Sequence, residues 1–181
     1  NKLIEALENV QTSNGTPYYD GLIQVAEKVF KNEPTEKYRG RRALVALSDG
    51  VDSTSISDYA EVKDLLEEAG IVTYFIQINT RENFEADLLG DCGTGVRFSE
   101  AQIRRYYGLF GKNSKIEKVY DFCKIGGFTR LEISKKLYEL ADVEMQTLAK
   151  NSGGKVFPVA SLNEARNAFR EVANAIGRDR R

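Results

Sequence analysis

The chain has 181 residues, of which 41% are hydrophobic and 10% aromatic, so it can bury one substantial core and is too short for three domains. Its 26 basic and 27 acidic side chains give a formal net charge of -1, which creates no general attraction to a nucleic acid or an anionic membrane. The absence of histidine excludes serine-histidine and cysteine-histidine nucleophile pairs, and 2 cysteines cannot complete a thiolate zinc site.

The first part of the chain predicts two helices. Apolar residues recur at helical spacing from Leu3 to Val10, and the polar, turn-forming segment from Gln11 to Gly15 then ends the pattern. Thr16 followed by Pro17 predicts a second helix that Thr16 caps, because proline is favoured at the first helical position. The expected buried stripe of this helix consists of Leu22, Val25, Ala26, Val29 and Phe30.

A strand-helix-strand unit follows. Ala43–Leu47 is apolar without alternation, which predicts a strand covered on both faces in a parallel sheet. After the turn-rich Ser48–Ser55, the spacing between Val62 and Ala69 predicts a helix that ends at Gly70, and Ile71–Ile78 predicts a second strand. Such a unit implies parallel strands and a layered α/β domain.

The last part of the chain returns to this order. The apolar spacing from Leu137 to Leu148 predicts a helix that ends at Gly153, and Lys155–Val159 predicts a third strand. Ser161 and Glu164 have the spacing of a capping box, which predicts a final helix ending at Gly177. Its expected apolar stripe consists of Ala165, Phe169, Val172 and Ile176.

The segment from Asn79 to about Ser134 is far longer than an ordinary connection and is expected to hold structure of its own. The capping-box spacing of Ser99 and Gln102 predicts a helix that ends at Gly111, and a second helix is expected near Ile116–Phe122. Cys92 and Cys123 could close a loop of about 30 residues or could be two unrelated thiols, and their spacing leaves both alternatives open.

Two oxygen donors stand near the predicted carboxyl edge of the sheet. Thr16 lies in a glycine-led loop, and Asp49 directly follows the first buried strand. Open α/β folds place ligands at this edge, and oxygen ligands suit hard divalent cations. Each residue also has a purely structural explanation, Thr16 as a helix cap and Asp49 as a partner of its own turn backbone.

Taken together, these motifs resemble the von Willebrand factor type A family, especially its bacterial members. The loop Gly15–Thr16, the strand that ends in Ser48–Gly50, the strand Ile71–Ile78 and the late Gly153–Phe157 follow that family's order. The resemblance implies a single domain over 1–181 with an insertion over about 80–134. Its implied fold is a three-layer, doubly wound, mostly parallel sheet with helices on both faces, lacking its first strands in this chain.

The resemblance also implies a metal-ion-dependent adhesion site, in which Thr16 and Asp49 would help to hold Mg²⁺, or Mn²⁺ or Ca²⁺. The family's DxSxS motif is absent: the nearest pattern, Asp52, Thr54 and Ile56, has isoleucine where a hydroxyl is required and follows Thr16 along the chain. We therefore expect weak or no metal binding by this chain alone. The implied function is non-catalytic protein binding and cell adhesion, with the ion capturing an acidic side chain of a protein partner.

No nucleic-acid partner and no membrane insertion are expected, since no apolar stretch approaches the roughly 18 residues of a spanning helix. An extracytoplasmic or cell-surface location is favoured. The insertion is expected to rise beside the metal face, with Arg97, Arg104, Arg105 and Tyr107 contacting the partner. Alternatively, its aromatic residues form a small core of their own and the arginines are solvated.

Two other functions compete with metal-dependent adhesion. Leu44–Ser53 resembles the pyrophosphate loop of ATP pyrophosphatase enzymes, although Asp49 stands where that loop has glycine and would repel a phosphate. The other alternative is a metal-free interaction scaffold that uses the surface of the insertion.

Overall fold

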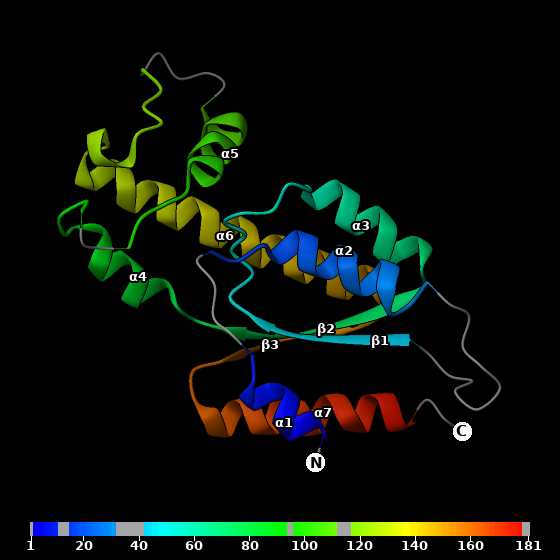
Figure 1. Ribbon diagram of the computed structural model, residues 1–181. Helices are drawn as coiled ribbons and strands as arrows, with labels where there is room; N and C mark the ends of the chain where they lie inside the picture. The colour runs from blue at the N-terminus through cyan, green and yellow to red at the C-terminus, as the bar shows by residue number, and fades with distance from the viewer. Residues whose placement is uncertain (1, 11–14, 32–41, 94–95, 112–116, 179–181) are drawn as a thin grey trace.

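The computed structural model describes residues 2–10, 15–31, 42–93, 96–111 and 117–178 (Figure 1). Its elements are α1 (Lys2–Glu8), α2 (Tyr18–Lys28), β1 (Arg42–Ser48), α3 (Tyr59–Glu68), β2 (Ile71–Ile78), α4 (Arg81–Leu88), α5 (Glu100–Phe110), η2 (Phe122–Lys124), α6 (Gly127–Ser152), β3 (Lys155–Val159) and α7 (Leu162–Arg178). None of the described helices combines the length and apolar character needed to cross a bilayer.

The three strands form an open parallel sheet in the order β1-β2-β3, which confirms the predicted α/β class and excludes a barrel. Arg42 of β1 lies opposite Ile71 of β2, and Tyr74 of β2 lies opposite Lys155 of β3. All three predicted strands are confirmed. Because the strands are parallel, their carboxyl ends meet at one edge of the sheet.

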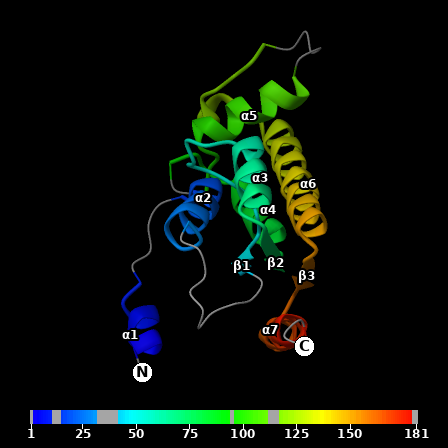
Figure 2. The same ribbon diagram turned by 90° about the vertical axis from the view of Figure 1, so that its right-hand side faces the viewer.

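Helices pack against both faces of the sheet (Figures 1 and 2). Ile71 and Phe75 of β2 belong to a core cluster built with α2, α3 and α6. The intervening residues Val72 and Tyr74 point to the other face, where they pack with Val172 of α7. The central strand is therefore the one fully buried on both faces, as its burial from Ile71 to Ile76 shows.

β1 is covered less completely than its apolar sequence suggests. Its side chains are mostly half-buried, and Leu47 is 52% exposed. The reason is its place at the edge of the described sheet, where β2 is its partner. Two predicted stripe residues also lie at the surface: Val29 follows the end of α2, and Phe169 of α7 is 47% exposed.

The insertion is largely helical and lies beyond the carboxyl ends of the strands (Figure 1). Its predicted capping box is confirmed, since Ser99 Oγ accepts from Gln102 N at 3.2 Å and Gln102 Oε1 accepts from Ser99 N at 3.0 Å. The sequence prediction missed α4, and α6 begins at Gly127, ten residues before the expected Leu137.

The second helix predicted near Ile116–Phe122 is wrong. Residues 117–121 are irregular, and only the short turn η2 follows, while Ile116 lies outside the described residues. Other contacts replace the helix: Val119 N donates to Tyr107 Oη at 3.4 Å, and the Asp121 carboxylate caps η2 by accepting from Cys123 N at 3.0 Å.

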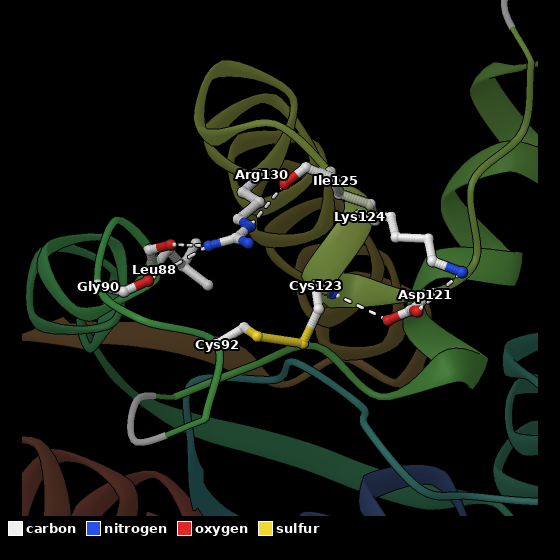
Figure 3. Close-up of a disulfide and its surroundings, with 8 residues drawn as sticks. All are labelled: Leu88, Gly90, Cys92, Asp121, Cys123, Lys124, Ile125 and Arg130. Atoms are coloured by element: carbon white, nitrogen blue, oxygen red, sulfur yellow. Dashed lines mark hydrogen bonds and ion pairs between the residues drawn. A yellow bond between two sulfur atoms is a disulfide. The ribbon is translucent and has the colours of Figure 1, made fainter.

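A disulfide between Cys92 and Cys123 joins the segment after α4 to η2 (Figure 3). Beside it, the buried guanidinium of Arg130 donates to the carbonyl oxygens of Ile125 at 2.9 Å and Leu88 at 3.0 Å. The two cysteines are therefore paired, which their spacing in the sequence had left open. The disulfide and the hydrogen bonds of Arg130 tie the segment after α4, η2 and the first turn of α6 together.

The disulfide should stabilise the insertion by restricting the unfolded chain. The cysteines are 31 residues apart, so the double substitution Cys92→Ser with Cys123→Ser should lower the free energy of unfolding by about 3–4 kcal/mol. Non-reducing peptide mapping should recover the two cysteines in one linked peptide pair. Alkylation of both thiols in the native, unreduced protein would contradict the pairing.

A tight contact at the start of β3 gives a second prediction. A Cβ at Gly154 would lie 1.9 Å from the Thr73 carbonyl oxygen, whereas one at Gly21 in α2 would meet nothing within 4 Å. Gly154→Ala should therefore lower the free energy of unfolding by roughly 2–3 kcal/mol. The control Gly21→Ala should raise it by about 0.5–1 kcal/mol, and urea denaturation giving the same sign for both would refute this packing.

Candidate functional site

Two loops far apart in the sequence meet at the carboxyl edge of the sheet. We call residues 15–20 and 52–57 the loop rim. Thr16 N donates to Ser53 Oγ at 2.6 Å, and Ser53 N donates back to the Thr16 carbonyl at 3.0 Å. The loop that carries Thr16 is thus fastened to the segment that follows Asp49.

Each half of the loop rim also supplies a carboxylate that accepts hydrogen bonds from backbone amides of the other half. Asp52 Oδ1 accepts from Tyr18 N at 2.9 Å and Tyr19 N at 3.3 Å, the first amides of α2. In return, the Asp20 carboxylate accepts from Ile56 N at 3.1 Å and Ser57 N at 3.0 Å. A carboxylate at a helix N-terminus is favoured by the unpaired amides and the helix dipole, so Asp52 caps α2 from another loop.

This arrangement corrects the predicted role of Thr16 as a helix cap. The N-cap residue of α2 is Pro17, whose side chain makes no capping hydrogen bond. No local pattern pointed to Asp52 as the cap, because 34 residues separate it from Tyr18. Asp20 offered a weak signal, as an acidic residue in the first turn of a helix.

Hydrogen bonds from the backbone amides of Ile56 and Ser57 hold the pKa of Asp20 below its usual value. A carboxylate with a lowered folded-state pKa stabilises the fold fully above its unfolded-state pKa. This contribution is lost as the pH falls through the folded-state value. Asp20 therefore carries its negative charge at neutral pH, where it accepts the hydrogen bonds of Ile56 and Ser57.

Asp49 is fixed by a separate set of contacts. Its Oδ1 accepts from Val51 N at 3.0 Å, and its Oδ2 accepts from Thr80 Oγ1 at 2.6 Å. Thr80 Oγ1 also lies 2.8 Å from the hydroxyl of Tyr138 on α6, whose pKa is raised by burial. Asp49 thus joins the loop after β1 to α4 and α6.

The two predicted metal ligands do not by themselves fit a magnesium ion. Both Asp49 oxygens are engaged, the Thr16 side chain is exposed, and no hydrogen bond joins the two residues. Across the described ranges, no group of three or more aspartate, glutamate, cysteine or histidine side chains is placed to hold a metal. Magnesium prefers near-octahedral oxygen coordination, so further donors would be required.

A cleft of about 570 Å³ opens beside Asp49, where β2 and β3 end. Asp49, Glu139, Asp142 and Glu164 line it, with Arg81 as its basic residue, and Thr16 is not part of its wall. Its charges are partly compensated, since Arg81 pairs with Glu85 at 2.7 Å and Glu139 with Lys136 at 2.9 Å. The two predicted ligands therefore share an edge of the sheet but not this cleft.

The four predicted partner-binding residues lie in different environments. Arg97 is exposed and has no ion pair among the described residues, and Arg104 pairs with Glu100 on the surface of α5. Tyr107 is only 8% exposed and belongs to the core of the insertion, as the alternative interpretation of its aromatic residues predicted. For these four residues, partner binding stays a prediction.

Arg105 takes part in a largely buried network that the sequence did not predict. Its guanidinium donates to Glu144 Oε1 at 2.6 Å and lies 4.9 Å from the centre of the Tyr19 ring. Tyr19 Oη donates to Glu144 Oε2 at 2.6 Å, and burial beside this carboxylate raises the pKa of Tyr19. The network joins α5 of the insertion to α2 and α6, so Arg105 positions the insertion against the sheet.

The loop Ser48–Ser53 does not form an open phosphate cradle. Gly50 N donates to Ser48 Oγ at 3.0 Å, and Val51 N donates to Asp49 Oδ1. The next helix, α3, is capped by Asp58, whose carboxylate accepts from Glu61 N at 3.0 Å. The amides that would have to approach a phosphate are already paired, and two carboxylates stand close to them.

No family model, curated protein or solved structure matches the chain.

Removing Arg105 should test the buried network. Arg105→Ala leaves the Glu144 carboxylate without its cation and should lower the free energy of unfolding by roughly 3 kcal/mol. Arg104→Ala removes an exposed pair on the same helix and should cost at most about 1 kcal/mol. Equal effects of the two substitutions in urea denaturation would argue against a positioning role for Arg105.

Proposed function

We propose that the chain is a non-catalytic protein-binding domain of the von Willebrand factor type A type. In this proposal the three-strand sheet belongs to a three-layer, doubly wound fold with helices on both faces. One observation carries the proposal: the glycine-threonine loop is hydrogen-bonded to the loop that follows Asp49, at the carboxyl edge of a parallel sheet. This is the edge at which open α/β folds bind ligands.

The loop rim is the surface proposed to contact the partner. Its backbone is held by hydrogen bonds from both loops, so little conformational entropy would be lost when a partner binds. Ser99 at the start of α5 donates to the Ser53 carbonyl, which brings the insertion against the same surface. The insertion can therefore contribute to partner choice without itself forming the rim.

The ion-dependent form of this function requires ligands in addition to Thr16 and Asp49. A DxSxS strand upstream of Asn1 would supply them, and the ion would then attract an acidic partner group. The residues present here support the second form, a metal-free interaction scaffold, because their oxygens are fixed by contacts within the protein. The disulfide supports an oxidising, extracytoplasmic location for either form.

Peptide selection tests the proposal without a known partner. Random displayed peptides are selected on the immobilised protein, and the dissociation constants of individual peptides are measured for the protein and two variants. Thr16→Arg adds bulk at an exposed rim position and should weaken binding at least about tenfold. Asn167→Arg, on α7 across the sheet, should leave binding unchanged. Peptides whose dissociation constants change only with Asn167→Arg would refute the proposed surface.

Magnesium dependence separates the two forms of binding. The metal-free form predicts equal peptide affinity in Mg²⁺ and in chelator, for the protein and for Asp49→Asn. A loss of affinity in chelator that Asp49→Asn reproduces would instead establish ion-dependent binding. Calorimetric titration of Mg²⁺ into the protein alone gives an independent measurement of the same site.

A further inference from the structure

Ile56 is the most exposed large apolar side chain of the described chain, at 98%. Single exposed apolar residues are common on protein surfaces, so exposure alone indicates no function. Ile56 differs because its loop is fixed in place. Its own amide donates to Asp20 Oδ2, the next amide donates to Asp20 Oδ1, and Ser55 Oγ accepts from Asp20 N at 3.1 Å.

The exposed position of Ile56 is therefore imposed by the loop rim. Ser55 Oγ also donates to Asp52, the residue that caps α2, so the loop is held from both of its sides. Because hydrogen bonds hold the backbone at Ile56, ordering that backbone costs little entropy on binding, and burial of the side chain still contributes its hydrophobic free energy. These are the properties of an interface anchor.

The charge around Ile56 indicates what kind of surface would receive it. Between Ala43 and Val62 the sequence contains no lysine or arginine. The same stretch holds four acidic residues, Asp49, Asp52, Asp58 and Glu61, and Asp20 in the first turn of α2 adds a fifth carboxylate. Asp58 and Glu61 are exposed close to Ile56 along the chain, so a partner with basic residues is electrostatically favoured.

We propose that Ile56 is the apolar anchor of the loop rim and inserts between apolar side chains of a basic, amphipathic segment of a partner protein. This inference rests on the proposed function, because it assumes that the loop rim binds a protein. It differs from the acidic partner group implied by the family resemblance. Without a resident ion, the carboxylates of the rim favour a cationic partner over an anionic one.

The probe is a synthetic amphipathic helical peptide of leucine and lysine, compared with the same peptide carrying glutamate in place of lysine. Binding is followed by fluorescence anisotropy, and ¹³C-labelled isoleucine methyl groups report the contact by NMR. The lysine peptide should bind and shift the Ile56 methyl signal, while the glutamate peptide should not bind. Failure of the lysine peptide to bind, or equal binding of both peptides, would overturn the inference.

Matched variants test the anchor and the charge separately. Ile56→Ser should weaken binding of the lysine peptide about tenfold, whereas Phe128→Ser, at a residue 93% exposed on the insertion, should have no effect. Glu61→Lys at the start of α3 should weaken binding several-fold, and Glu68→Lys at the end of the same helix should not. Unchanged affinity for Ile56→Ser would overturn the anchor.

The two proposals can fail independently. If displayed peptides respond to Thr16→Arg but not to Ile56→Ser, the loop rim binds proteins and the anchor assignment is wrong. If peptides respond to neither substitution, both the proposed function and the anchor are wrong. Circular dichroism and the urea midpoint of each variant establish that the fold is intact in every comparison.

Discussion

The candidate site depends on hydrogen bonds between two segments that are far apart in the sequence. Each segment supplies a carboxylate that accepts from backbone amides of the other. Asp52 accepts from the first amides of α2, and Asp20 in the first turn of that helix accepts from Ile56 and Ser57. Each carboxylate satisfies backbone amides that neither loop could satisfy alone. The result is one rigid surface at the carboxyl edge of the sheet. It is built from residues 15–20 and 52–57, which are far apart in the sequence.

The insertion is attached to this surface through polar contacts and through Val51 of the loop after β1, which packs against the core of the insertion. Its own core is separate, and the disulfide and Arg130 close it at the far end (Figure 3). Toward the sheet, Glu144 receives hydrogen bonds from Arg105 and Tyr19, and Ser99 donates to Ser53. Buried charged contacts depend strongly on geometry, so they fix the orientation of the insertion relative to the loop rim.

Local patterns were sufficient to predict the parts of the fold whose stabilisation is local. The β-rich run of β2, the capping box of α5 and the end of α6 at Gly153 were all visible in the sequence. The errors occur where distant residues decide the structure: Asp52 replaces Thr16 as the cap of α2, and contacts to Tyr107 and the disulfide replace a helix before Phe122. The candidate site was predictable only as an edge of the sheet, since its hydrogen bonds join residues 33 to 37 positions apart.

Amide hydrogen exchange in the Asp52→Asn variant is the most direct test of a jointly fixed rim. The substitution weakens the cap of α2 without removing the Asp20 carboxylate. If the two segments fix each other, amide exchange should become faster at Tyr18 and Tyr19 and also at Ile56 and Ser57, whose acceptor is Asp20, with protection in β2 unchanged. Faster exchange confined to Tyr18 and Tyr19 would show that the two loops are independent and would contradict the account.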